Sequence, residues 1–78
     1  MSEDYYDALS LYLDFAINYP WHDDVPDRLM KAAEITEKQY RDPDMTIDLL
    51  AVIMDRYPDT NTANQAQRRL ARYTNANW

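Results

Sequence analysis

The groups best suited to metal or acid–base chemistry are an imidazole and two carboxylates in one short stretch, His22, Asp23 and Asp24. Groups of these types can bind a divalent cation. Three adjacent side chains on a short turn seldom converge on one ion, however, and the sequence has no cysteine and no second histidine to complete a ligand set. The stretch therefore favours an exposed turn whose acids cap the next helix, and we expect no metal and no other cofactor.

Two other arrangements could support catalysis, and neither has the surroundings that it needs. Ser2 and Ser10 carry no signature of the strained turn that exposes a nucleophilic serine. Asp7 and Asp14 share one helical face. A general acid, however, needs a carboxyl group that burial keeps protonated, and a chain of 78 residues offers little depth for that. Because the sequence also lacks glycine, it cannot form a glycine-rich phosphate loop, and we expect a protein that is not an enzyme.

Length and composition indicate one globular domain over residues 1–78. Hydrophobic residues make up 46% of the chain and charged residues 28%, which is the composition of a folded protein rather than a disordered one. Because Asn-Gly and Asp-Gly turns are absent, a sheet of short strands is disfavoured. The first residues lack the basic and apolar segments of a signal peptide, and no apolar run approaches about 18 residues. We therefore expect a cytoplasmic protein that does not enter a membrane.

Hydrophobic periodicity predicts an all-α protein of four antiparallel helices, at about residues 4–19, 25–40, 44–57 and 61–74. Pro20 and Pro58 end the first and third helices, because the residue before a proline is driven out of the helical region. Pro26 fits the first turn of the second helix. The residues predicted to face the core are Tyr5, Ala8, Leu9, Tyr12, Phe15, Ala16 and Tyr19, then Val25, Leu29, Ala32, Ala33, Thr36 and Tyr40, then Ile47, Leu50, Ala51, Ile53, Met54 and Tyr57, and finally Ala63, Ala66, Leu70 and Tyr73.

An internal repeat relates the two halves of the chain at an offset of 38 residues. Residues 9–20 align with residues 47–58, apolar position with apolar position, and both segments end in Tyr-Pro. Each proline is followed by a polar stretch and another helix. The repeat predicts two similar helical hairpins that stack, because neither hairpin can bury its apolar side alone.

The repeated segment resembles the second helix of a tetratricopeptide repeat. That helix carries a small residue, an aromatic residue four positions later, a small or apolar residue three beyond it, and a proline five further on. Two sets of residues follow this spacing: Ala8, Tyr12, Phe15 and Pro20, and, with weaker identities, Thr46, Leu50, Ile53 and Pro58. The offset is 38 rather than 34 residues, and the glycine and the Trp-Leu-Gly-Tyr signature of the family are absent, so an unrelated four-helix bundle remains the alternative. The resemblance implies protein binding without catalysis.

Charge is distributed unevenly along the chain. Residues 1–27 contain seven acidic residues and neither lysine nor arginine, whereas the rest of the chain contains seven acidic and eight basic residues, which gives the total of −6. An acidic N-terminal third repels nucleic acid and attracts a basic partner, and a solvated acidic face without a partner is the alternative. Arg68, Arg69 and Arg72 have no interleaved aromatic residues and are too few to indicate a nucleic-acid site.

A second apolar stripe on the first predicted helix, formed by Tyr6, Leu13 and Ile17, cannot be covered by the neighbour that covers the first stripe. It either packs against the third helix, binds another protein, or pairs two copies of the chain as a homodimer. Met45, Leu49 and Val52 form a comparable stripe on the third helix. The residues predicted to contact a partner are Asp4, Tyr6, Asp7, Leu13, Asp14, Ile17, Trp21, Asp23 and Asp24.

The sequence thus predicts a non-enzymatic protein–protein interaction module, an acidic helical adaptor for a protein with a basic or amphipathic surface. A hypothesis of another class is a small acidic inhibitor, of the bacteriocin-immunity or phage anti-defence type, which blocks a nucleic-acid-binding enzyme or complex. This alternative rests on size and charge. Neither hypothesis includes direct contact with nucleic acid or with a membrane.

Overall fold

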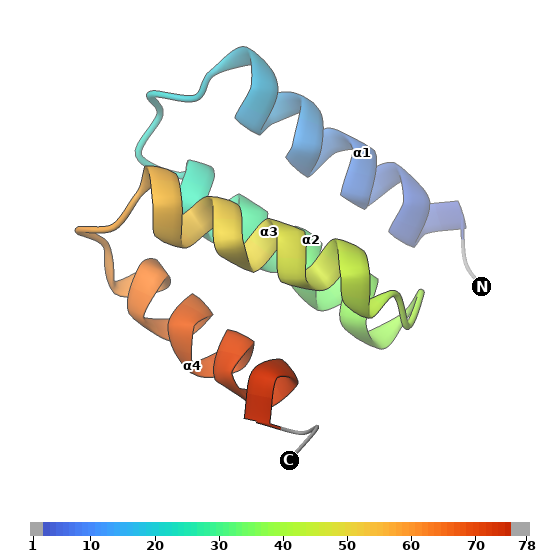
Figure 1. Ribbon diagram of the computed structural model, residues 1–78. Helices are drawn as coiled ribbons and strands as arrows, with labels where there is room; N and C mark the ends of the chain where they lie inside the picture. Colours follow the sequence, from blue (N-terminus) through green and yellow to red (C-terminus); the bar gives the residue numbers. More distant parts are fainter. Residues whose placement is uncertain (1–2, 76–78) are drawn as a thin grey trace.

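The computed structural model describes residues 3–75, and over that range it contains four helices and no strand (Figure 1). The helices are α1 (Glu3–Asn18), α2 (Val25–Lys38), α3 (Pro43–Arg56) and α4 (Asn61–Asn75). Consecutive helices run antiparallel and pack against one another, which confirms the prediction of an all-α fold made of stacked helical hairpins (Figure 1). The helix ends lie within two residues of the predicted bounds.

Prolines and capping side chains set the helix ends. The helices α1 and α3 stop just before Pro20 and Pro58, as the restriction on residues that precede proline requires. Before α3, the carboxylate of Asp42 accepts a hydrogen bond from the backbone N–H of Met45 at 3.1 Å, which satisfies one of the free N–H groups of the first turn. Asp24 occupies the same position before α2, but its side chain makes no capping hydrogen bond.

The turn between α2 and α3 reverses the chain without glycine. Arg41 adopts the left-handed conformation with φ 50°, which for a residue with a Cβ costs about 1–2 kcal/mol. A polar cluster beside the turn holds this conformation. The N–H of Asp42 donates to the carbonyl of Thr36 at 2.9 Å, and the hydroxyl groups of Thr36 and Thr46 lie 2.7 Å apart in the core. The Thr46 hydroxyl also donates to the carbonyl of Asp42 at 2.8 Å, so the buried hydroxyl groups connect both helices to the turn.

Helix α2 is the centre of the molecule, because it packs against each of the other three helices. Helix α3 packs against α2 and α4, as its two apolar stripes predict, whereas no Cα atom of α1 lies within 8 Å of a Cα atom of α3 in the described residues. Seven of the fourteen residues of α2 are buried, among them all of the predicted core positions except Tyr40, which follows the helix and is half-buried. The core hydrophobic residues are Val25, Leu29, Met30, Ala32, Ala33, Leu49, Leu50, Ile53, Ala63 and Ala66.

Helix α1 is an edge helix, and the prediction that its tyrosines are core residues is wrong at two positions. Tyr5 is 39% exposed and Tyr19 is 50% exposed. The cause is that α2 is the only helix that packs against α1 in the described part of the chain, so one neighbour covers only part of its apolar circumference. The α1 side chains that do pack against the core remain partly buried; they are Leu9, Tyr12, Leu13, Phe15 and Ala16.

Polar contacts join α2 to α4. The hydroxyl of Tyr73 donates to Oε2 of Glu37 at 2.5 Å, and the guanidinium of Arg69 lies 3.7 Å from Glu34 and 3.9 Å from Glu37. Arg69 is therefore partly covered, and the prediction that α4 exposes all of its arginines is wrong for this residue, while Arg68 and Arg72 are exposed. Burial, and then the hydrogen bond to Glu37, raises the pKa of Tyr73 above its ordinary value of 10.0.

Candidate interaction surface

The large hydrophobic side chains that are exposed within residues 4–74 all belong to α1 or to the turn after it. They are Tyr5 (39%), Tyr6 (63%), Leu11 (68%), Ile17 (74%), Tyr19 (50%) and Trp21 (75%). Single exposed apolar residues are ordinary, but six within 17 consecutive positions form an apolar surface of the kind that marks interaction sites.

Helix α4, at the other end of the stack, exposes side chains of a different kind. Its exposed side chains are Asn61, Asn64, Gln65, Gln67, Arg68, Arg72 and Thr74, and all of them are polar. Stacked helical proteins need a polar outer face on their terminal helices to stay soluble. Of the two outer helices, α4 therefore has the surface of a terminal cap, whereas α1 has the surface of a helix that is covered by a further element.

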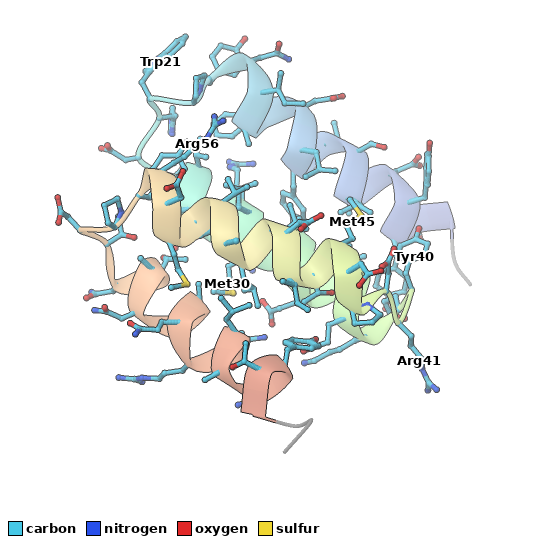
Figure 2. All side chains as sticks on the ribbon, in the orientation of Figure 1. Trp21, Met30, Tyr40, Arg41, Met45 and Arg56 are labelled. Carbon is cyan, nitrogen blue, oxygen red and sulfur yellow. The ribbon has the colours of Figure 1, made fainter. Side chains whose placement is uncertain are left out.

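A groove of about 390 Å³ lies between α1 and α3. Its lining comes from three helices and two connections, namely Leu13, Ala16, Ile17 and Pro20 on the α1 side, Leu29 of α2, and Val52, Arg56 and Tyr57 on the α3 side. The two walls run parallel, because the chain reverses direction once before α2 and once after it (Figure 1). Figure 2 shows Met45 pointing from α3 into the space between α3 and α1, on the same side as this groove. Because Ile17 is so exposed, the groove is open to solvent along its α1 wall.

Exposed aspartates border both walls of the groove. Asp14 lies three residues before Ile17 on α1, and Asp48 and Asp55 lie four residues before and three residues after Val52 on α3. Side chains at these separations are neighbours on a helix surface. All three aspartates are exposed. The apolar groove thus has an acidic rim on each side.

One end of the groove is fixed by a hydrogen bond and carries a cation. The hydroxyl of Tyr57 donates to the carbonyl of Pro20 at 2.7 Å and so joins the end of α3 to the α1–α2 connection. Arg56 lies at the same end, near this connection (Figure 2). Within residues 3–75 the exposed guanidinium of Arg56 forms no ion pair. This end of the groove is therefore basic.

The 38-residue offset shows which face of α1 lacks a neighbour. Leu11 corresponds to Leu49 of α3, which is 8% exposed, and Tyr19 corresponds to Tyr57, which is half-buried. Phe15 corresponds to the fully buried Ile53. In α1 the ring of Phe15 is covered instead by the guanidinium of Arg28, 4.3 Å from the ring centre, and by the ring of His22 at 5.0 Å.

A second depression, of about 280 Å³, lies on the side of α1 away from the groove and has mixed charge. It is lined by Tyr12, Asp24, Asp27, Arg28 and Lys31. Its charges are partly engaged with one another, since Arg28 lies 3.9 Å from Asp24, and Asp27 accepts a hydrogen bond from the hydroxyl of Thr62 at 2.5 Å. The first contact lies within the start of α2, the second joins α2 to α4, and the depression has no apolar surface comparable with that of the groove.

The histidine turn is exposed, as expected from the sequence, but the expected capping of the next helix is wrong for Asp24, whose side chain makes no capping hydrogen bond. Nδ1 of His22 accepts a hydrogen bond from the N–H of Asp24 at 3.1 Å and lies 3.9 Å from the Asp24 carboxylate. This contact joins the residues on either side of Asp23 within the turn. Among the residues that the structure describes, no group of three or more histidine, cysteine, aspartate or glutamate side chains could hold a metal ion.

The structure divides the predicted contact residues into two groups. Leu13 and Ile17 line the groove, and Asp14 lies on its rim. Tyr6 belongs to the same stripe of α1, one turn or more before the groove. The remaining residues are exposed and lie either on the first turns of α1 or in the turn after it; they are Asp4, Asp7, Trp21, Asp23 and Asp24. Trp21 packs edge-on against Tyr19, with ring centres 6.0 Å apart.

Sequence reasoning missed part of this surface. Leu11 was assigned to neither apolar stripe, and Arg56 and Tyr57 were not recognised as groove residues. Leu49, in the second apolar stripe of the third helix, is buried and so is not available to a partner. The Tyr-Pro repeat contained a usable signal for Tyr57, because the second tyrosine contacts the first proline.

No helix in residues 3–75 is both long enough and apolar enough to cross a membrane. Comparison of the chain with protein-family models, with curated proteins and with solved structures finds no match. The resemblance to the tetratricopeptide family therefore stays a prediction from the sequence.

Proposed function

We propose that this protein is a non-enzymatic protein-binding module whose partner covers α1. The observation that carries the proposal is the concentration of exposed hydrophobic side chains between Tyr5 and Trp21, on a helix that only α2 packs against in the described residues. Aromatic residues such as Tyr6 and Trp21 are the side chains that most often dominate binding energy in interfaces. A partner that covers them would supply the neighbour that α1 lacks.

The charge of this region defines the partner further. Asp4, Asp7 and Asp14 are exposed on α1, and Asp23 and Asp24 are exposed in the turn after it. Charges around an interface accelerate the encounter of complementary surfaces and exclude partners of like charge. The partner is therefore a protein with a basic or amphipathic surface.

The test combines affinity capture from the source cells with binding kinetics on the purified partner. We expect the association rate constant to fall as ionic strength rises, and to fall in the variant Asp7→Lys plus Asp14→Lys. The matched control is Asp59→Lys plus Asp44→Lys, which changes the net charge equally on α3 and the turn after it. If the association rate constant changes neither with salt nor with the α1 charges, the electrostatic part of the proposal is wrong. If the affinity is unchanged after Trp21→Ala plus Leu11→Ala, the apolar part is wrong.

A second candidate is that the bound partner is a nucleic-acid-binding enzyme or complex, which this protein inhibits. The observation that favours it is the pair of aspartate rows, Asp7 and Asp14 on α1 and Asp48 and Asp55 on α3, each with a seven-residue spacing. Rows of exposed carboxylates on parallel helices present negative charge as a nucleic-acid backbone does. This candidate predicts that duplex DNA or RNA competes with the protein for the captured partner, whereas an adaptor would bind its partner in the presence of nucleic acid.

A further inference from the structure

We infer that the groove between α1 and α3 binds a single amphipathic helix of the partner, with an apolar stripe in the groove, basic side chains on both flanks and an acidic first turn against Arg56. This inference rests on the proposed function and specifies one docking site within it. It is drawn from the shape, lining and charge of the groove.

The side chains that line the groove favour a partner helix with an apolar stripe. Leu13, Ala16, Ile17, Leu29 and Val52 supply side chains from three helices, and none of them carries a polar group. The α1 stripe from Tyr6 to Ile17 extends over twelve residues, or about 16 Å from the first to the last at the rise of an α-helix. A helix of about three turns matches this length, and helix-in-groove recognition places its apolar residues at spacings of three and four.

The acidic rims of the groove favour basic residues on both sides of the apolar stripe of the partner helix. A helix seated between α1 and α3 directs the residues on either side of its apolar stripe toward Asp14 on one wall and toward Asp48 and Asp55 on the other. Lysine or arginine at these flanking positions meets acidic residues on both sides. Acidic flanks would meet repulsion on both sides, so the groove discriminates between helices that share the same apolar stripe.

The basic end of the groove, at Arg56, determines the direction in which the helix binds. The helices α1 and α3 both end at the Pro20 and Tyr57 contact, where Arg56 lies free of ion pairs within residues 3–75. Acidic residues are favoured in the first turn of a helix because they interact with the positive end of its dipole. An occupant that begins at this end, antiparallel to α1 and α3, places such an acidic residue beside Arg56.

The probe is a synthetic 15-residue peptide with an acetylated N-terminus, glutamate in its first turn, leucines at helical spacing and lysines on both flanks. The control peptide has the same leucines, with glutamates in place of the lysines. We expect the first peptide to bind at least about tenfold more tightly than the second, and to shift the backbone NMR resonances of groove residues such as Leu13 and Val52. Equal binding of the two peptides, or shifts confined to the depression beside Arg28 and Lys31, would overturn the inference.

Two variants on the same helix test the site directly. Ile17→Asp places a charge in the groove, and we expect about tenfold or greater loss of peptide affinity, as for loss of a central anchor residue. Asn18→Asp is the matched control, because Asn18 is exposed beside Ile17 on α1 but does not line the groove, and this variant should bind the peptide normally. Both positions are exposed, so both variants fold, which circular dichroism verifies. The inference fails if Ile17→Asp binds the peptide as well as the parent protein does.

The orientation is tested with a nitroxide spin label on either end of the peptide. A label at the N-terminus should broaden the resonances of Tyr57 and Arg56, and a label at the C-terminus should broaden those of Met45 and Tyr6. The reverse pattern would overturn the assigned direction. If the native partner still binds the Ile17→Asp variant with parent affinity, the proposed function stands and the groove is not its site. Sedimentation that shows a dimer of the parent protein and a monomer of Ile17→Asp would instead assign the groove to a second copy.

Discussion

The hydroxyl of Tyr57 donates a hydrogen bond to the carbonyl of Pro20 at 2.7 Å. These residues belong to the two Tyr-Pro pairs that end α1 and α3, so the tyrosine of the second repeat contacts the proline of the first. The contact joins segments 37 residues apart in the chain and fixes the spacing of α1 and α3 at one end, although their helical backbones do not touch. The groove between them therefore has a defined width at this end.

Replacing Tyr57 with phenylalanine should lower the free energy of unfolding by about 1 kcal/mol, the usual net contribution of such a hydrogen bond. Tyr19→Phe is the matched control, because Tyr19 occupies the same place in the first repeat and is half exposed, and it should change stability by less than about 0.5 kcal/mol. Urea denaturation of both variants measures the difference. Equal effects of the two substitutions would show that the Pro20 contact contributes nothing.

The buried hydroxyl pair of Thr36 and Thr46 should show strong non-additivity. Either single substitution by valine removes the contact between the two hydroxyl groups, while the remaining threonine keeps its hydrogen bond to a backbone carbonyl, so each should cost about 1 kcal/mol. The double substitution removes both sides of that contact, so it should cost less than the sum of the single substitutions. A double-mutant cycle followed by chemical denaturation gives the coupling energy. Strict additivity would mean that the two hydroxyl groups do not interact in solution.

Replacing Asp42 with alanine should destabilise the protein by about 1 kcal/mol, because the first turn of α3 loses the acceptor for the N–H of Met45. Asp24→Ala is the control at the same position before α2, where the side chain makes no capping hydrogen bond. Asp24→Ala removes only solvent-exposed contacts with Arg28 and His22, for which a change of about 0.5 kcal/mol or less is expected. Thermal unfolding of the two variants should therefore differ, and a larger loss for Asp24→Ala would contradict this account.

The stability of the protein should fall at alkaline pH through Tyr73. Burial and the hydrogen bond to Glu37 raise the pKa of Tyr73 above 10.0, so the folded state retains the phenolic proton more strongly than the unfolded chain. This contribution is fully present below pH 10 and is lost as the pH rises through the folded-state pKa. Tyr73→Phe should flatten the alkaline decline measured by urea denaturation from pH 8 to about pH 11, whereas Tyr6→Phe, an exposed control, should leave it unchanged.

Periodicity and prolines were sufficient to predict the helices, because they act within single segments. An apolar residue every three or four positions, ended by Pro20 or Pro58, defines a helix whatever its neighbours are. The buried face of α2 also followed from its pattern, since Val25, Leu29 and Ala32 were predicted to face the core and all are buried.

The exposed surface of α1 could not be predicted, because it depends on which helices are present around it. Tyr5 and Tyr19 have the spacing of core residues, yet they lie beyond the reach of α2. Leu11 belongs to neither apolar stripe predicted for the first helix and is 68% exposed, whereas its counterpart in the second repeat, Leu49, is buried. Periodicity reports which faces of a helix are apolar, and only the arrangement of the helices reports which of them are covered.

One wall of the groove was predicted from the sequence, and its other parts were not. The stripe of Leu13 and Ile17 was identified from its spacing, but its opposite wall depends on the distance between α1 and α3. That distance is set in part by the bond between Tyr57 and Pro20, a contact between residues remote in the chain. Arg56 carried no distinguishing pattern in the sequence, because a cation in the last turn of a helix is commonplace.

The thinness of the molecule, which measures 37 × 34 × 15 Å, couples its folding to occupancy of the groove. A domain of this size buries a smaller fraction of its chain than a larger domain does and starts from a low stability, so a ligand that adds a further helix contributes a large share of the total. At a ligand concentration of 100 times Kd, the folded state gains about 2.7 kcal/mol. A shift in the melting temperature of this small domain is thus a direct and label-free assay with which candidate partners can be screened.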